Sequence, residues 1–290
     1  MTGPTQVGGS GPTVLRILLG TQLRQLREAK GISREDAGYT IRASGSKISR
    51  MELGRVGFKP RDVADLLTLY GVLGPDERRA LLALAEEANQ PGWWHRFSDV
   101  LPGWFQAYVG LEAAAALIRT YEVQFVPGLL QTPDYMRAVV SLGRNKMPRE
   151  DIERRVDLRI TRQQVLYRPR PVRLWAVVDE AALRRPIGGK EVMRAQIDHL
   201  MTAAKSPSVT LQVIPFGSGG HAGAGGSFTI LRFADHQMPD VVYLEQLTSA
   251  LYLDRREDVD AYLEAMERLC VEADPPGRTM ETLDQIMREI

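Results

Sequence analysis

The sequence predicts an α+β protein, in which an all-α region of five short helices precedes a mixed α/β region. Apolar residues recur at helical spacing through the first ninety positions, and short β-branched or aromatic runs begin near position 172. Helical segments separate those runs, which is typical of a layered α/β arrangement. With 290 residues and 44% hydrophobic content, the chain can bury two cores. Residues 1–12, rich in Gly, Pro, Thr and Ser, predict a disordered tail.

Five helices are expected between residues 14 and 89. The first covers 14–30, where leucines and a valine follow the helical period before a glycine. Ser33 is a suitable N-cap for a second helix through 41, and Ser44 begins a third that ends near 54. Pro60 and Pro75 occupy favoured first-turn positions of a fourth helix to 70 and a fifth to 89.

The formal net charge of +1 hides an uneven distribution. Residues 1–70 hold 11 Lys and Arg against 6 Asp and Glu, a net charge of +5, which leaves 26 against 30, or −4, for the remaining 220 residues. A basic patch in one region is the electrostatic requirement for binding a polyanion. The amino-terminal quarter is therefore the part expected to bind nucleic acid.

The residues of these helices also carry a family resemblance. The segments Leu23-Arg-Gln-Leu-Arg-Glu-Ala-Lys-Gly-Ile-Ser33 and Lys47-Ile-Ser-Arg-Met-Glu-Leu-Gly54, followed by Pro60, resemble the helix-turn-helix of Xre-type, lambda-repressor-like regulators. The resemblance implies that residues 13–90 form a helix-turn-helix domain that binds double-stranded DNA. It also implies a homodimer, because such regulators place two recognition helices across a two-fold operator.

The third helix is expected to supply the contacts with bases. Ile48 and Met51 must face the core, so the opposite side of that helix faces the major groove. Arg50 is the best candidate for a bidentate contact with guanine. The residues predicted to contact bases are Ser44, Gly45, Ser46, Ser49 and Arg50. Those predicted to contact phosphates are Arg42, Lys47, Arg55 and Lys59. The alternative is that this is an ordinary solvated helix face.

The remaining region, 91–290, should contain strands and helices in alternation. Strands are predicted at 172–178, 209–215, 227–233, 241–244 and 250–253. Helices are predicted at 110–119, 133–142, 150–167, 179–183, 189–204 and 256–273. The segments 119–122, 126–132, 179–184 and 221–228 resemble the carboxy-terminal domain of an actinobacterial, antitoxin-like group of Xre-type regulators. This resemblance implies a regulatory, dimerisation or partner-binding domain and a small partner protein encoded nearby.

Charge is also segregated within this second region. Residues 144–173 hold 10 basic and 4 acidic residues, a net charge of +6, whereas residues 234–290 hold 5 and 14, a net charge of −9. The basic stretch could be a second surface for DNA or an acidic partner, or simply a solvated helix. The two stretches could also attract each other within one chain or between two chains.

Polar residues at predicted strand ends suggest one further site. Asp179, Glu180 and Glu245 end predicted strands, and His221 lies in the glycine-rich loop 217–226, so a ligand or partner site could form there. Helix capping and an ion pair with Arg184 or Arg185 are the simpler interpretation of Asp179 and Glu180. The loop lacks the Gly-Lys-Ser/Thr of a phosphate-binding loop and precedes a strand, so a mobile loop or a hairpin connection is expected.

No catalytic, metal-binding or cofactor motif accompanies these residues. The single cysteine, Cys270, lies in an apolar helical stretch and is expected to be a buried thiol. No apolar run reaches the roughly 18 residues of a membrane span, so a cytoplasmic location is expected. We therefore expect a sequence-specific DNA-binding transcriptional regulator without enzymatic activity or cofactor. The alternative is a ligand-responsive regulator whose second domain senses a small molecule.

Overall fold

The computed structural model describes residues 12–143, 147–234 and 238–290. The chain forms two compact units, Met1–Arg96 with Gln106–Ala114, and Phe97–Phe105 with Ala115–Ile290. The tail expected at 1–12 lies outside the described residues, apart from Pro12 at the start of the first helix. The domain boundary expected at 90/91 stays a prediction. Each unit is described by itself below.

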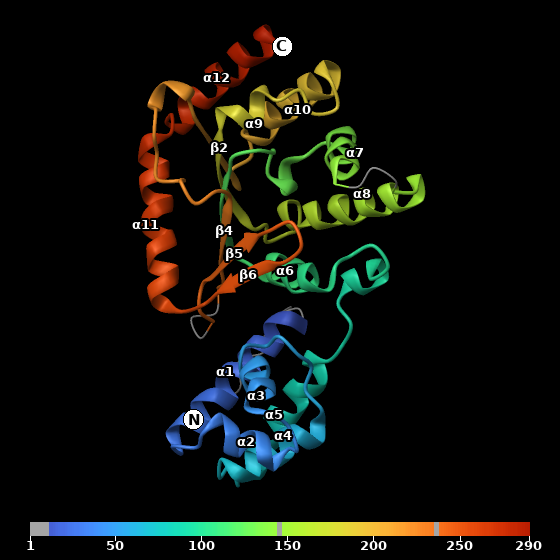
Figure 1. Cartoon of the computed structure of the whole chain (residues 1–290), viewed down its shortest axis with the longest axis vertical. Coiled ribbons are helices and arrows are strands. Elements are labelled where there is room, and N and C mark those ends of the chain that lie inside the picture. Colours follow the sequence, from blue (N-terminus) through green and yellow to red (C-terminus); the bar gives the residue numbers. More distant parts are fainter. Residues whose placement is uncertain (1–11, 144–146, 235–237) are drawn as a thin grey trace. The chain divides into compact units, whose positions relative to one another are not determined.

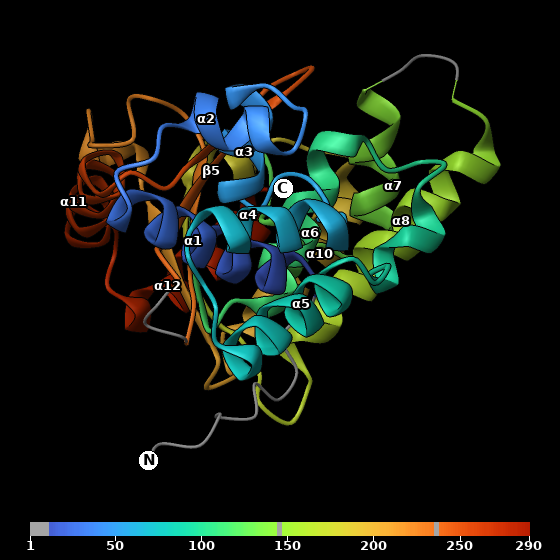
Figure 2. The same ribbon diagram turned by 90° about the horizontal axis from the view of Figure 1, so that it is seen from below.

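The first unit is entirely helical (Figures 1 and 2). Its helices are α1 (Pro12–Ala29), α2 (Arg34–Thr40), α3 (Gly45–Glu52), α4 (Pro60–Leu69) and α5 (Pro75–Ala88), followed by a 3-10 turn (Trp93–Phe97) and most of α6 (Gly103–Ala114). The five predicted helices are confirmed, with ends that differ by two residues at most from those expected. Ser33 and Ser44 accept backbone N–H groups at the starts of α2 and α3, as predicted.

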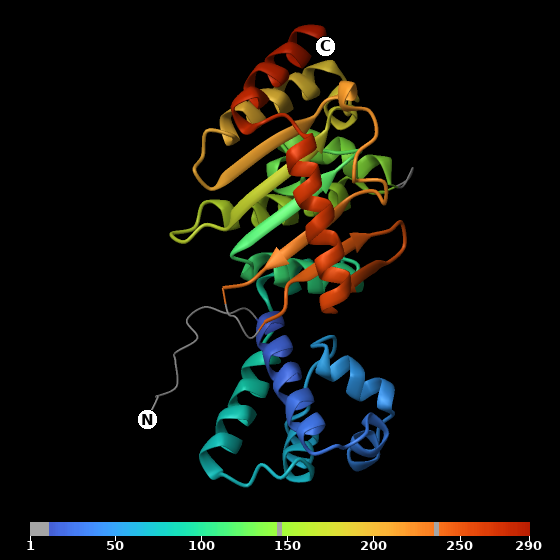
Figure 3. The same ribbon diagram turned by 90° about the vertical axis from the view of Figure 1, so that its left-hand side faces the viewer.

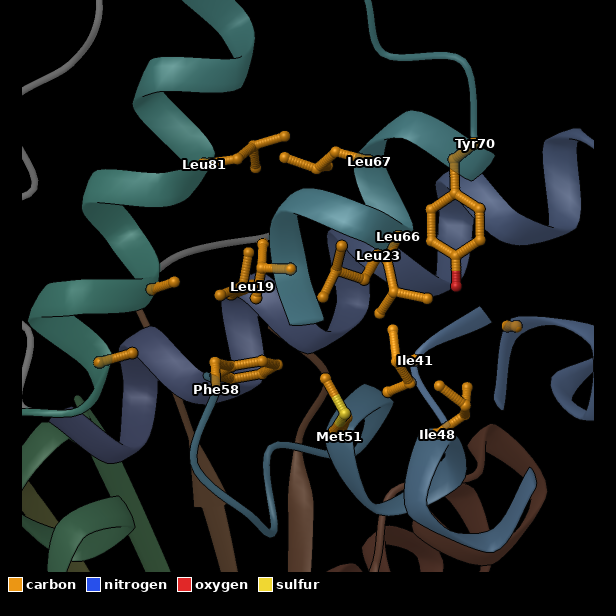
Figure 4. Close-up of a cluster of buried hydrophobic side chains, with 14 of the residues drawn as sticks. Leu19, Leu23, Ile41, Ile48, Met51, Phe58, Leu66, Leu67, Tyr70 and Leu81 are labelled. Atoms are coloured by element: carbon orange, nitrogen blue, oxygen red, sulfur yellow. The ribbon is translucent and has the colours of Figure 1, made fainter. Parts of the chain in front are cut away.

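The core of the first unit gathers side chains from all five helices (Figure 4). Leu19 and Leu23 of α1 meet Ile48 and Met51 of α3, and all four are at most 1% exposed. Gly20 lets the two helices approach, since a Cβ there would lie 2.5 Å from the carbonyl oxygens of residues 51 and 52. This close crossing fixes how α3 is presented to solvent.

The second unit is built on one six-stranded sheet. Its strands are β1 (Leu117–Glu122), β2 (Arg173–Asp179), β3 (Val209–Ile214), β4 (Phe228–Arg232), β5 (Val241–Glu245) and β6 (Ala250–Leu253), in the spatial order β3-β2-β1-β4-β5-β6. The first three are parallel, whereas β4, β5 and β6 pair antiparallel with their neighbours. The carboxyl ends of β1, β2, β3 and β5 consequently meet at the same edge of the sheet.

Helices cover the two faces of this sheet unequally (Figure 1). Helix α11 (Arg256–Glu272) lies on one face, and α7 (Pro133–Leu142), α8 (Arg149–Gln163) and α10 (Lys190–Ala203) lie on the other. Short helix α9 (Glu180–Arg184) follows β2, and α12 (Pro276–Glu289) packs against β3 and α10. The remaining 3-10 turns are Gly128–Leu130, Gln164–Leu166 and Phe216–Ser218. The α+β fold class is confirmed.

Two secondary-structure expectations for the second unit are wrong. The helix predicted at 110–119 ends at Ala114, and Leu117–Glu122 instead forms β1 at the centre of the sheet. Pairing on both sides, with β2 and β4, outweighs the local helical propensity there. Helix α12 was not predicted, although Thr279, Leu283 and Ile286 place buried side chains at helical spacing. No helix in the described part of the chain is long and apolar enough to cross a membrane.

Candidate nucleic-acid interface and polar sheet edge

Helices α2 and α3, joined by a tight turn, form the candidate nucleic-acid interface (Figure 2). Arg42 adopts a positive φ of 54° in that turn, a conformation that costs a residue with a Cβ some energy. A Cβ on Gly38 would lie 2.7 Å from the carbonyl oxygen of Ala43, so the turn folds back closely on α2. The turn and the two N-caps hold α3 at one angle to α2.

The outer side of α3 carries the residues predicted to contact bases. Ile48 and Met51 are each 1% exposed and face the core, as predicted. Ser44, Ser46 and Arg50 are exposed, whereas Gly45 and Ser49 are half-buried. Among the described residues the Arg50 guanidinium has no ion-pair partner, so it is available to a ligand. Contact of these five residues with bases stays a prediction.

The residues predicted to contact phosphates differ in their surroundings. Arg42, Arg55 and Lys59 are exposed on either side of α3. Lys47 instead directs its Nζ to Oδ2 of Asp62 on α4, at 2.7 Å, and the Asp62 side chain is only 6% exposed. Lys47 thereby ties α3 to α4, a role that spacing in the sequence does not reveal. The contact of Lys47 with phosphate stays a prediction.

A buried ion-pair cluster holds the inner end of α3. The Glu52 side chain, 3% exposed, accepts hydrogen bonds from Arg27 Nε at 2.5 Å and from Arg34 Nε at 3.1 Å. Pairing with Glu52 raises the pKa of Arg27, while burial raises that of nearby Tyr70 to about 12. The three charged residues link α1, α2 and α3. Sequence analysis noted Glu52 only as part of the family pattern and did not identify this cluster.

An open groove at the turn exposes one residue that sequence analysis missed. Tyr39, Thr40, Arg42, Ala43 and Ser44 line it, and the Tyr39 side chain is 87% exposed at the end of α2. Its position beside the amino end of α3 adds Tyr39 to the residues that could contact nucleic acid.

The basic stretch 144–173 forms mainly internal contacts where the structure describes it. Arg154 binds Asp99 through two nitrogens at 2.8 Å, and Arg159 donates to the side chain of Gln131 at 3.0 Å. Arg162 is buried, with its guanidinium 5.0 Å from the ring centre of Phe105. These three arginines of α8 therefore contact neighbouring parts of the second unit, which favours a structural role for them over a second DNA surface. Positions 144–146 lie outside the described residues.

In the second unit, Asp179 and Glu180 have the simpler of the two expected roles. Asp179 caps α9 by accepting the backbone N–H of Ala181 at 2.8 Å. Glu180 is buried and accepts Nε of Arg184 at 2.5 Å. Its second oxygen accepts the backbone N–H of Phe216 at 2.7 Å. Both carboxylates are thus occupied by structural partners.

His221 ties the glycine-rich loop to the same strand end. Its Nε2 lies 3.3 Å from Oδ2 of Asp179 and 3.4 Å from the hydroxyl of Tyr121. Nδ1 accepts the backbone N–H of Gly223 at 3.1 Å, so the neutral ring carries its proton on Nε2. With both nitrogens engaged, His221 serves to anchor the loop and is poorly placed to act as a base. The expected mobile connection therefore has fixed points, and a further one joins Ala222 N–H to Glu272 at 3.0 Å.

Glu245 belongs to a different group, on the opposite face of the sheet. The register places Asp179 on the face of α11, but Glu245 and Glu122 on the face of α8. Tyr243 donates its hydroxyl to Glu245 at 3.1 Å. The four predicted residues therefore do not form one site, because strand alternation divides them between two faces.

Glu122 is the titratable residue that sequence analysis missed. Burial first, and then the negative charge of Glu245, raise the pKa of its carboxyl from 4.5 to about 7. The hydroxyls of Ser227 and Thr120 and the charge of Arg159 act in the opposite direction. A carboxyl that titrates near neutrality is common at functional sites. Its only signal in the sequence was its place in the 119–122 segment of the family resemblance.

No group of three metal-binding side chains occurs among the residues that the structure describes. Cys270 is half-buried rather than buried, and desolvation raises the pKa of its thiol. A raised pKa keeps the thiol protonated and unreactive.

Two family comparisons match the chain. Residues 105–285 match a family described as a domain of unknown function, DUF5753. Residues 18–81 match a family described as a helix-turn-helix domain, which supports a DNA-binding regulator. Neither match distinguishes the Xre-type or antitoxin-like group. No curated protein and no solved structure matches the chain.

Proposed function

This chain belongs to the DUF5753 family, and we propose that it is a sequence-specific DNA-binding transcriptional regulator that acts in the cytoplasm and is not an enzyme. The observation that carries the proposal is the exposed side of α3, where Arg50 has no internal ion-pair partner among the described residues. The Glu52 cluster and the Lys47–Asp62 pair fix this helix from its inner side.

In this proposal α3 enters the major groove of double-stranded DNA. Arg50 donates two hydrogen bonds to a guanine, and Ser44, Ser46 and Ser49 contact neighbouring base edges with less selectivity. Arg42, Arg55 and Lys59 bind phosphates on either side and set the register. Gly45 contributes no side chain, so few bases are read directly by each copy.

The test is binding to an operator selected in vitro from random duplexes. Arg50→Ala should weaken binding to the selected operator by about 1–3 kcal/mol while affecting a random duplex much less, as measured by fluorescence anisotropy. Arg79→Ala, an exposed arginine on α5, is the matched control and should change neither affinity. Equal losses on operator and random duplex for Arg50→Ala would contradict base reading by this residue.

The second unit, in our proposal, mediates dimerisation and binds a small protein encoded nearby, as in antitoxin-like regulators. One recognition helix contacts too few bases for high specificity, which favours a dimer. The basic and acidic stretches of the second unit, +6 and −9, favour a charged protein partner. Purification of the chain from its native host, followed by mass spectrometry, tests the partner. Recovery of no stoichiometric small protein would contradict it.

The pair Glu122 and Glu245 favours one second candidate, a regulator that senses a small molecule. Their mutual repulsion in a partly buried setting would be relieved by a ligand with a positively charged or hydrogen-bond-donating group. Thermal-shift screening of metabolites, with Glu122→Gln as the control, tests this candidate. A ligand that stabilises both proteins equally does not use this pair.

A further inference from the structure

Helix α11 covers only part of its face of the sheet. It starts beside β6, packs against β5 and ends against β3, so it crosses the strands diagonally (Figure 3). Tyr121, Val177 and Ile214, near the carboxyl ends of the parallel strands, are buried beneath it. Toward the amino ends, residues on the same face are half-buried or exposed: Leu117, Arg119, Arg173, Trp175 and Thr210. We call these five residues the open triangle.

Arg119, on β1 at one side of the open triangle, has no ion-pair partner among the described residues. Its Nε is buried without a hydrogen-bond partner, and its guanidinium lies 5.6 Å from the ring centre of Trp175. Gln212 holds the Trp175 ring by accepting its N–H at 2.8 Å. Partly buried arginines are normally paired with an acid, because desolvating an unpaired charge is costly. The Arg119 guanidinium, held against the Trp175 ring, is therefore a candidate to bind an anion from outside the unit.

The outer side of α11 presents acids to solvent. Glu257, Glu264 and Glu267 are exposed and form no ion pair with a described residue. The same helix exposes 85% of the side chain of Val271. Acids and an apolar residue on α11 thus belong to the same face of the sheet as the arginines and the aromatic ring of the open triangle.

We propose that this surface is self-complementary and that α11 of a second copy packs on the open triangle. In a two-fold dimer the same contact forms twice, so α11 of each copy would cover the open triangle that α11 of the other copy leaves uncovered. Glutamates of the partner's α11 would pair with Arg119 and Arg173, and its apolar side chains would pack near Trp175 and Leu117.

Charge complementarity favours a second copy over an unrelated occupant. A surface built only to receive an acidic partner would carry arginines alone, whereas this one carries both signs side by side. The inference rests on the dimer of the proposed function and names its interface. It places that interface in the second unit, independent of the DNA-binding helices.

Charge reversal in the full-length chain tests the interface. We expect Arg119→Glu with Arg173→Glu, and separately Glu257→Arg with Glu264→Arg, to weaken self-association about 100-fold each, tenfold for each of the two symmetric contacts. An equimolar mixture of the two variants should dimerise again, because both contacts then join opposite charges. Sedimentation velocity and light scattering measure the states. Glu281→Arg, an exposed acid on α12, should dimerise like the wild type.

Thermal unfolding checks that each variant is folded, and Arg173→Glu alone replaces the basic-side variant if Arg119→Glu impairs folding. A wild-type chain that is monomeric at all concentrations overturns the inference, as does dimerisation that neither variant changes or that the mixture fails to restore. Binding to a half-operator, which needs one copy only, is measured separately. Self-association that neither variant changes, with half-site binding intact, disproves the interface without touching DNA recognition. A wild-type chain that self-associates as expected but does not bind the half-operator disproves DNA recognition alone.

Discussion

The two units treat their partly buried charges differently. In the first, Glu52 binds two arginines and Asp62 binds Lys47, so these two buried carboxylates each have a cationic partner within 3.1 Å. In the second, Glu180 is also paired, with Arg184, but Glu122 has hydroxyls, another carboxylate and the charge of Arg159 around it, and Arg119 lies against an aromatic ring. Paired charges resist change, because breaking either pair leaves an uncompensated charge. Charges without such a pair can bind a proton, a ligand or another chain. The Glu52 and Asp62 pairs therefore favour a rigid surface on the first unit, whereas Glu122 and Arg119 favour a binding role for the second.

Removing Glu52 should produce the largest effect on stability. Glu52→Gln removes the buried partner of the 8%-exposed Arg27 side chain and leaves it only the half-exposed Glu28 at 3.3 Å, so we expect the first unit to lose about 3–5 kcal/mol of stability. Guanidinium denaturation followed by circular dichroism measures the loss. Glu28→Gln is the matched control, since this carboxylate is 50% exposed and should contribute at most about 1 kcal/mol. A similarly small loss of unfolding free energy in both variants would show that the Glu52 cluster does not stabilise the packing of α3.

The second prediction concerns the pH dependence of the second unit. The folded pKa of Glu122, about 7, exceeds its ordinary value of 4.5, so its contribution is greatest below pH 4.5 and is lost as pH rises to 7. From this residue we expect the free energy of unfolding to fall by roughly 3 kcal/mol over that interval. Glu122→Gln should abolish this fall in the free energy of unfolding. Glu245→Gln should lower the pKa of Glu122 and so shorten the pH interval over which the fall occurs. An unchanged fall in Glu122→Gln would assign the dependence to other groups.

The smallest expected effect concerns Lys47. Asp62→Asn should free the Lys47 ammonium to bind a phosphate, and so strengthen binding to all duplexes. The slope of log affinity against log salt concentration should become steeper by about one. The stability cost should be about 1 kcal/mol, because Lys47 is 30% exposed and can be hydrated. Anisotropy titrations at several salt concentrations measure the slope, with Asp65→Asn on the same helix as the control. A slope unchanged from wild type would mean that Lys47 does not reach phosphate.

Local signals in the sequence predicted most of the secondary structure. Caps at Ser33, Ser44 and Thr132 and prolines in the first turns placed helix starts within a few residues. The strand β1 was not predicted, because its place between β2 and β4 depends on partners 56 and at least 107 residues away in the chain. Pairing at such separation leaves no trace in a window of a few residues.

The candidate sites divide in the same manner. Helical spacing alone predicted that Ile48 and Met51 face inward and that Arg50 faces solvent. Asp179 and Glu245 end predicted strands and His221 lies in a nearby loop, which suggested one site for all three. The sheet register, however, places Glu245 on the opposite face from the other two. The period of a helix is local, whereas the faces that two strands share depend on their pairing.

The sequence by itself determined the helical amino-terminal unit, the direction in which α3 points and the segregation of charge. These follow from periodicity, capping and composition, which act over a few residues. Only the tertiary structure decided which charges are neutralised. It buried Glu52 between two arginines and tied Lys47 to Asp62. It placed Glu122 near a second carboxylate, and gave Arg119 no ion-pair partner among the residues that the structure describes. Coulomb interactions and desolvation depend on distance in space, and the fold alone sets that distance.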